Sequence, residues 1–147
     1  MNRRELLVQG MGMSSIASVA ALMQATEVLA ADAKPSAAST GLTKVFETSS
    51  RCVSTGLVCI RHCQKELMAG NKMIAECLQS VLELVSACEN LMKLVAFESA
   101  YAKDFAKLTA KICADCGKLC EKHANHMEAC KACMEACREC EKACKAA

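Results

Sequence analysis

Apolar residues recur every three or four positions along most of the chain after residue 43. Within residues 72–96 they are Ile74, Leu78, Val81, Leu82, Val85, Leu91, Leu94 and Val95. Residues three and four apart share one face of an α-helix, so this period indicates helices rather than strands. Glycine is sparse after residue 41 and proline occurs once, at Pro35, which leaves long stretches without helix breakers. The pattern predicts helices over residues 43–68, 72–96, 99–122 and from 125 almost to the end.

Local signals support the ends of these helices. Gly70 and Asn71 form a favourable stop for the first helix, and Ser99 can cap the start of the third. Glu128 in the first turn and Lys142 in the last turn of the fourth helix match the helix dipole. Helices of about 20–26 residues are ~30–39 Å long. Joined by short loops, they predict an all-α protein, an antiparallel up-down-up-down four-helix bundle.

Cysteine is the unusual part of this pattern, with 13 cysteines among 147 residues. In the last helix the spacings alternate between three and four residues, at Cys130, Cys133, Cys137, Cys140 and Cys144. The other cysteines also fall at helical spacing: Cys52, Cys59, Cys63, Cys77, Cys88, Cys113, Cys116 and Cys120. Each helix therefore carries thiols on one face. In an antiparallel bundle these faces predict a cysteine-lined core, a column of sulfur along the bundle axis.

Charge and composition exclude some classes of partner. The net charge is +2, from 18 basic and 16 acidic residues, and aromatic residues make up 3% of the chain. A nearly balanced charge gives no electrostatic attraction to nucleic acid or to a membrane surface. Bases also have few aromatic side chains on which to stack. We expect neither a nucleic-acid nor a membrane partner.

The N-terminus resembles a twin-arginine export signal. Arg3 and Arg4 precede a modest apolar run rich in glycine, methionine, serine and alanine, although Glu5 departs from the usual pattern. Small residues permit cleavage after Ala30 or after Ala33. The run is interrupted by glycine and serine and is shorter than the ~20 strongly apolar residues of a membrane anchor. The alternative is a first helix of the folded domain.

These features divide the chain into three parts. We predict a signal peptide in residues 1–30, a flexible linker in 31–42 and the four-helix bundle in 43–147. Such a signal predicts an exported, periplasmic protein.

Three uses of so many cysteines can be weighed against one another. A disulfide scaffold is disfavoured because the cysteine count is odd, and because thiols three or four apart in a helix seldom reach disulfide geometry. Cysteine as a small apolar residue is disfavoured because leucine, isoleucine or valine would bury more apolar area. Metal binding is the interpretation that the spacing favours.

Soft thiolate ligands select Cu(I), zinc and iron–sulfur clusters. The Cys-x-x-Cys pairs here lie on continuous helices, whereas structural zinc sites usually place them in turns. The sequence lacks a ferredoxin cysteine run and the Glu-x-x-His pair of di-iron bundles. Cu(I) accepts two or three thiolates, so two cysteines four residues apart can hold one ion. Such pairs are Cys59/Cys63, Cys116/Cys120, Cys133/Cys137 and Cys140/Cys144. We predict a protein that binds multiple Cu(I) ions.

The chain resembles the bacterial four-helix-bundle copper storage proteins, specifically their exported branch. The resemblance rests on the His62-Cys63 pair, the run from Cys113 to Cys120 and the ladder from Cys130 to Cys144. It implies storage of Cu(I), approaching one ion per cysteine, without enzymatic activity. It also implies loading through one end of the bundle and a homo-oligomer, a tetramer in the family.

In that family, histidine and methionine at the open end admit copper. The resemblance therefore adds His62, Met68 and Met73 to the metal-binding residues, all near the first turn of the chain. Three further residues flank the turn between the third and fourth helices and fall at the same end, with roles left open: His123, His126 and Met127.

Other functions remain as alternatives. A copper chaperone, or a zinc or metal-detoxifying thiolate protein, would bind fewer ions. A thiol redox enzyme needs one exposed, activated cysteine pair and usually a thioredoxin-like context of strands, which this pattern does not predict. The protein that accepts copper from the chain is not identified by the sequence.

Overall fold

A computed structural model describes residues 37–147 of the chain. The described residues form four α-helices and no strand: α1 (Ala37–Met68), α2 (Ala75–Ala96), α3 (Ala102–Glu121) and α4 (Glu128–Ala146). A short 3₁₀ turn, η2 (Lys72–Ile74), leads into α2. None of these helices is long and apolar enough to cross a bilayer. The predicted signal peptide, and residues 31–36 of the predicted linker, lie outside the described residues.

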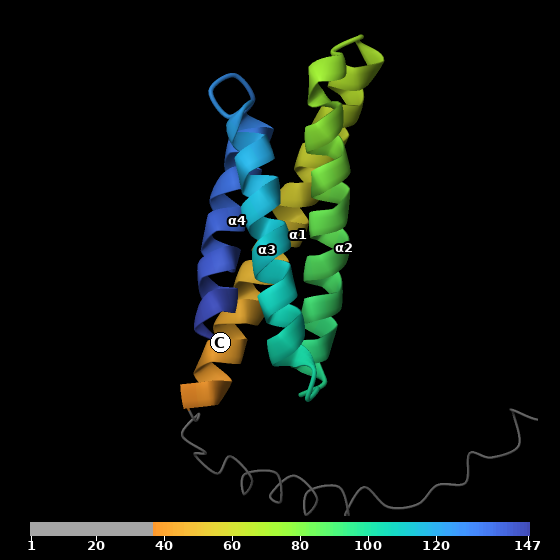
Figure 1. Ribbon diagram of the computed structural model, residues 1–147. Helices are drawn as coiled ribbons and strands as arrows, with labels where there is room; N and C mark the ends of the chain where they lie inside the picture. Colours follow the sequence, from red (N-terminus) through yellow and green to blue (C-terminus); the bar gives the residue numbers. More distant parts are fainter. Residues whose placement is uncertain (1–36) are drawn as a thin grey trace, which may run out of the picture. The chain divides into compact units, whose positions relative to one another are not determined.

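The helices form an antiparallel bundle, as predicted (Figure 1). Each helix packs against two others: α1 against α2 and α4, and α3 against α2 and α4. Residues 69–74 and 122–127 connect α1 to α2 and α3 to α4 at one end, which we call the paired-loop end. Residues 97–101 connect α2 to α3 at the opposite, single-loop end, where α4 also finishes.

The predicted helix ends differ from the structure in detail. Residues 37–42, which were assigned to the linker, are the first turns of α1. Alanine and leucine there favour a helix, and Pro35 is tolerated just ahead of one. The third helix starts at Ala102 instead of Ser99. The Ser99 hydroxyl accepts a hydrogen bond from the Tyr101 N–H (3.3 Å) and so organises the turn that precedes α3.

Two helices end in the same way. At the end of α1 the Asn71 N–H bonds to the Glu66 carbonyl (3.0 Å), while Gly70 has a φ of 92°. After α2 the Ser99 N–H bonds to the Leu94 carbonyl (2.9 Å), and Glu98 has a φ of 51°. A hydrogen bond across six residues with a left-handed residue inside it is the Schellman helix stop. Gly70 meets the requirement at no steric cost, whereas Glu98 adopts a conformation unusual for a residue with a Cβ.

Helices α1 and α2 approach closely at Gly56. A Cβ atom at Gly56 would lie 2.6 Å from a Val85 methyl, which is too close for real atoms. Valine in a helix is stiff about χ1, so Val85 cannot easily move aside. The glycine therefore sets the spacing of the two helices. Apolar side chains share this core with the cysteines, among them the fully buried Val45, Ile74, Val81, Leu84 and Leu91.

Candidate metal centre

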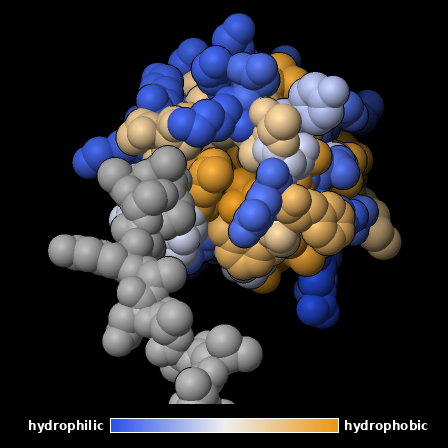
Figure 2. Space-filling model, turned by 90° about the horizontal axis from the view of Figure 1, so that it is seen from below, coloured by the Kyte–Doolittle hydropathy of each residue, from blue (hydrophilic) through white to orange (hydrophobic). Residues whose placement is uncertain are grey.

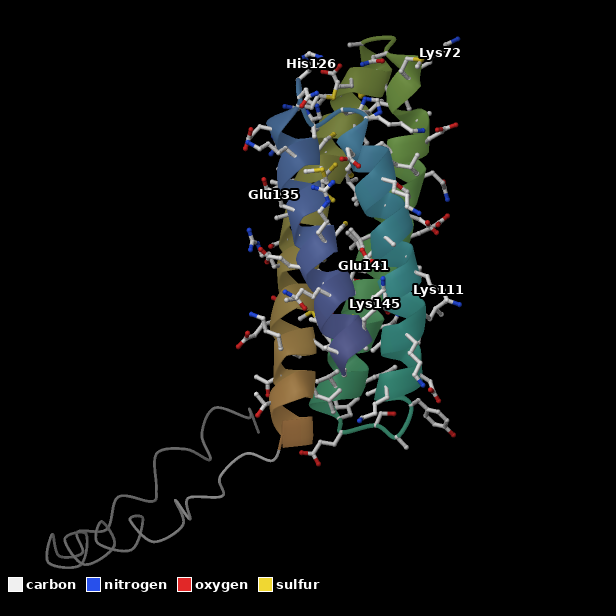
Figure 3. All side chains as sticks on the ribbon, turned by 60° about the vertical axis from the view of Figure 1, so that its left-hand side comes forward. Lys72, Lys111, His126, Glu135, Glu141 and Lys145 are labelled. Carbon is white, nitrogen blue, oxygen red and sulfur yellow. The ribbon has the colours of Figure 1, made fainter. Side chains whose placement is uncertain are left out.

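All thirteen cysteines are buried, none more than 2% exposed, and all are free thiols. Every helix contributes: α1 three, α2 two, α3 three and α4 five. Figure 3 shows their sulfur atoms between the helices, whereas the charged side chains extend outward. The cysteine-lined core that the spacing predicted is confirmed.

The thiols gather into groups whose sulfur atoms all lie within 4.8 Å of one another. From the paired-loop end downward they are Cys59/Cys63/Cys77/Cys130, Cys59/Cys120/Cys133, Cys116/Cys133/Cys137 and Cys52/Cys88/Cys113/Cys140. Two cysteines, Cys59 and Cys133, belong to two groups each. The first three groups are therefore linked through common sulfur atoms, whereas the fourth shares no cysteine with them.

Short contacts extend the column to its ends. The Sγ atoms of Cys77 and Cys120 are 3.6 Å apart and connect α2 to α3. The Sγ atoms of Cys140 and Cys144 are 3.8 Å apart, which adds the last cysteine of the chain. The pairs Cys59/Cys63 and Cys116/Cys120 are at 3.8 and 3.9 Å. The structure thus brings together the cysteines that the sequence paired at a spacing of four residues.

These separations suit a shared metal ion. Metal–sulfur bonds of about 2.3 Å place two sulfur atoms roughly 3.8–4.0 Å apart on a tetrahedral or trigonal ion, and about 4.6 Å apart on a linear two-coordinate ion. The observed contacts of 3.6–3.9 Å lie close to the shorter separation without any movement of the helices. A closed structural zinc site uses four cysteines of its own. The three groups that share sulfur atoms suit a series of ions with two or three ligands each, whereas the Cys52/Cys88/Cys113/Cys140 group has four cysteines of its own.

Hydrogen bonds between thiols give the cysteines different pKa values. Thiol hydrogen bonds, first that of Cys113, lower the pKa of Cys52 to about 6. The hydrogen bond with Cys120 likewise lowers the pKa of Cys77, and thiol hydrogen bonds lower the pKa of Cys133. A donor that stabilises a thiolate makes its proton easier to remove. Every sulfur group therefore contains a cysteine that can lose its proton first, as a metal ligand must.

The histidine and methionine candidates all belong to the paired-loop end. His62 precedes Cys63 on α1, and its Nε2 atom is buried without a hydrogen-bond partner among the described residues. Met68 and Met73 are 88% and 79% exposed and lie outside the sulfur column. Figure 3 shows His126 and Lys72 at this same end of the bundle.

A pocket of about 430 Å³ opens at the same end. It is lined by Lys72, Met73, Glu76, Lys122 and His123. A carboxylate oxygen of Glu76 pairs with the Lys122 ammonium at 3.3 Å across the α2–α3 boundary. Met73 and His123 therefore line the same pocket. The sequence did not identify this pairing, because it depends on the register between α2 and α3.

A buried hydroxyl also belongs to the column and was missed by the sequence analysis. Ser49 is fully buried, and its Oγ lies 3.6 Å from the Sγ of Cys140. The available signal was its position three residues before Cys52, on the same face of α1.

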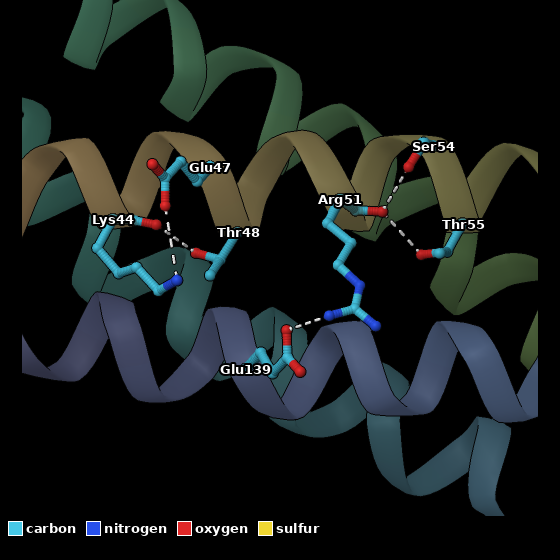
Figure 4. A network of polar contacts seen from close by, with 7 residues as sticks. All are labelled: Lys44, Glu47, Thr48, Arg51, Ser54, Thr55 and Glu139. Carbon is cyan, nitrogen blue, oxygen red and sulfur yellow. Dashed lines mark hydrogen bonds and ion pairs between the residues drawn. The ribbon is translucent and has the colours of Figure 1, made fainter.

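Charged residues on the outer faces are separate from this core. Arg51 on α1 pairs with Glu139 on α4 at 2.6 Å, and Lys44 pairs with Glu47 at 3.5 Å (Figure 4). The Arg51 and Glu139 side chains are each 51% exposed, so their pairing contributes little to stability. The pair shows which residues of α1 and α4 lie at the same level.

Comparison with known proteins identifies the family of this fold. The family model described as "Copper storage protein" matches residues 38–147. A cytosolic copper storage protein from Streptomyces lividans, solved with five coppers, is 25% identical, with a TM-score of 0.67 over 74% of this chain and 92% of that one. Copper storage protein 3 from Bacillus subtilis, in its metal-free form, is 27% identical, with a TM-score of 0.61 over 71% of this chain and 95% of that one. Its Cu(I)-bound form is 25% identical, with a TM-score of 0.66 over 72% of this chain and 96% of that one. Among curated protein sequences, none matches.

The comparisons correct the predicted location. The prediction of an exported, periplasmic protein is contradicted, because the similar protein from Streptomyces lividans is described as cytosolic. The residues that suggested export, 1–30, lie outside the described residues. Paired arginines ahead of an alanine- and glycine-rich run are a weak signal, and Glu5 already departed from the export pattern.

The family match covers most of the chain and all of its cysteines. The solved structures share its four-helix architecture over more than nine-tenths of the lengths of these relatives. The chain therefore belongs to the copper storage protein family.

Proposed function

We propose that this chain stores many Cu(I) ions on the cysteine thiolates of its core, approaching one ion per cysteine, and catalyses no reaction. The observation that carries the proposal is the sharing of Cys59 and Cys133 between neighbouring sulfur groups. Shared sulfur allows one thiolate to bridge two ions, so the number of ions can approach the number of cysteines. Counting the Cu(I) ions bound per chain tests this function.

A copper chaperone, or a zinc or metal-detoxifying protein that binds fewer ions, is the alternative. A chaperone needs one accessible site from which its ion is transferred. Here the thiols run through the whole length of the bundle, and even Cys144, near the single-loop end, is only 2% exposed. Ions held at that depth are suited to retention rather than to rapid transfer.

Copper would load through the paired-loop end. The first sulfur group lies there, since its Cys63 is close to the C-terminal end of α1 and its Cys77 is close to the start of α2. Towards the single-loop end the core is filled by apolar side chains, including the fully buried Val45, Leu91 and Ala106. An ion that entered there would lose its hydration among these side chains before it reached Cys144, the last thiol of the column, and that desolvation is costly.

His62 is the residue best placed to pass copper to the first sulfur group. The Arg51–Glu139 pair and the Cys59–Cys130 contact (3.9 Å) fix the register of α1 and α4, which places His62 level with Met127. Imidazole nitrogen and thioether sulfur both bind Cu(I). The unpartnered Nε2 atom of His62 is available for such a bond. Met68 and Met73, exposed at the same end, would be the first ligands that an incoming ion meets.

We expect His62→Ala to slow copper uptake several-fold while leaving the total capacity unchanged. The variant removes a transfer ligand but no thiolate, so the rate falls and the number of sites does not. Stopped-flow mixing with a Cu(I)–chelator complex measures the rate of transfer. His126→Ala, at an exposed histidine of the same end, is the matched control. Equal uptake rates in His62→Ala and the wild type would contradict a transfer role.

We also propose that the chain forms a homo-oligomer, with the tetramer as the state implied by family resemblance. Exposed apolar residues follow the outer side of the α1–α2 pair, and Leu57 and Leu82 are 53% and 42% exposed. Phe46 and Phe97 line a hollow of about 500 Å³ on the same helices. Seen from the single-loop end, apolar side chains also reach the surface between hydrophilic ones (Figure 2). An apolar face of this kind is typical of a subunit interface.

Leu82→Glu is expected to reduce the molecular mass in solution from that of an oligomer to that of a monomer. A carboxylate buried in an apolar interface loses its hydration without gaining a partner. Light scattering coupled to gel filtration measures the mass. Leu108→Glu places the same charge at an exposed leucine of α3 and should leave the oligomer intact. A monomeric wild type would refute the proposal.

A further inference from the structure

Ser49 differs from the buried threonines Thr48 and Thr109 in the direction of its hydroxyl. In helices a serine or threonine hydroxyl commonly returns to a carbonyl three or four residues back. Thr48 and Thr109 do so, donating to the carbonyls of Lys44 (2.9 Å) and Phe105 (2.9 Å). Ser49 instead crosses to α4, where its Oγ lies 3.6 Å from the Sγ of Cys140.

The other hydrogen-bond partners of the Cys140 sulfur are thiols, which lose their protons when they bind a metal. Ser49 is fully buried beside the end of the column formed by Cys140 and Cys144. At the same level the charged residues Arg51 and Glu139 pair with each other on the outer surface (Figure 4). Arg51 and Glu139 therefore neutralise each other at the surface and do not stabilise charge on the sulfur atoms.

A hydroxyl beside a copper-binding thiolate can stabilise the negative charge of the copper–thiolate group. A Cu(I) ion held by two thiolates carries a net charge of minus one. A buried negative charge is costly unless hydrogen-bond donors stabilise it. A hydroxyl that donates to a metal-bound sulfur also fixes the orientation of that ligand.

We infer that Ser49 is a positioning residue of the store: its hydroxyl donates to the Cys140 thiolate when Cu(I) occupies the Cys140–Cys144 end of the column. The inference rests on the proposed storage of copper and adds a group that is not a thiol. In the metal-free protein hydrogen bonds from neighbouring thiols, first that of Cys113, already stabilise the Cys140 sulfur and lower its pKa, so the Ser49 contact contributes little. In the loaded protein it is charge-assisted and therefore stronger.

The test compares Ser49→Ala with Thr48→Val, which removes a neighbouring buried hydroxyl bound to its own helix. Competition with the Cu(I) chelator bathocuproine disulfonate measures how tightly the ions are held. Ser49→Ala should keep the copper capacity of the wild type but hold the ions at this end about tenfold more weakly. Thr48→Val should hold all its ions as the wild type does.

Thermal unfolding separates positioning from a merely structural role. Ser49→Ala should lower the Tm of the copper-loaded protein and leave that of the metal-free protein nearly unchanged. Equal lowering of both would show that Ser49 only packs the core and would overturn the inference. Wild-type affinity at every equivalent of copper would also overturn it. A wild type that binds few copper ions would instead refute the storage function itself.

Ser49→Cys provides an independent check. A thiol at this position lies on the same face of α1 as Cys52 and next to Cys140. Since Cu(I) accepts two or three thiolates, the copper capacity should rise by about one ion per chain. An unchanged capacity would show that position 49 does not reach a bound ion, contrary to the inference.

Discussion

Anaerobic titration of the reduced protein with Cu(I) should saturate near one ion per cysteine, close to the 13 thiols of the chain. The physical reason is the close spacing of the sulfur atoms, because Cys59 and Cys133 link three of the groups and the fourth adds four more thiols. Each thiolate can bridge two ions, and each ion needs only two or three thiolates. Sulfur-to-copper charge-transfer absorption and the copper content after gel filtration give the count. Saturation at one to four ions would instead favour a chaperone or a zinc site.

A matched pair of variants shows whether the ions are distributed along the column. Replacing Cys52, Cys88, Cys113 and Cys140 together by serine removes one complete sulfur group and should lower the capacity by about four ions, since thiolates are the ligands. Cys144→Ser, at the end of the column, should lower it by about one ion. A capacity that falls to zero in the first variant would indicate a single cooperative cluster rather than a series of sites.

The cysteine column is the part of the structure that the sequence predicted best. Helical spacing determines which side chains share a face, and the antiparallel order determines which cysteines lie at the same level. Both follow from the pitch of the helix alone. The sharing of Cys59 and Cys133 between groups could not be predicted, because it depends on the separation and rotation of the helices. That separation is set partly by Gly56, whose effect appears only when Val85 is placed against it.

Local signals gave some helix ends and not others. Gly70 marks the end of α1 because glycine readily takes a positive φ, and the structure confirms it. Glu98 takes the same role after α2 without a glycine signature, so the turn and the start of α3 were placed too early. The contact between Ser49 and Cys140 could not be predicted from the sequence, for a different reason. A serine on a helix gives no indication of whether its hydroxyl returns to the backbone or crosses to another helix.

Metal-free protein should already be folded and helical, and copper should then raise its stability strongly. The first expectation follows from the core, in which Val81, Leu84 and Leu91 are fully buried and need no metal to pack. The fully buried thiols also behave as small apolar groups when protonated. Far-ultraviolet circular dichroism before and after removal of copper measures the helix content. Complete loss of helix on copper removal would make this a metal-nucleated domain instead.

The second expectation follows from linkage between binding and folding. A ligand that binds only the folded state adds about 2.7 kcal/mol of stability when its free concentration is one hundred times its Kd. Several such ions together exceed the roughly 5–15 kcal/mol by which a domain of ordinary stability is held folded. The loaded protein should therefore resist urea concentrations that fully unfold the metal-free form. Unfolding at the same urea concentration in both forms would mean that the copper is held at the surface, where unfolding does not release it. Because the folded bundle brings several thiols within reach of one ion, copper should bind the folded state more tightly, and storage should therefore stabilise the fold.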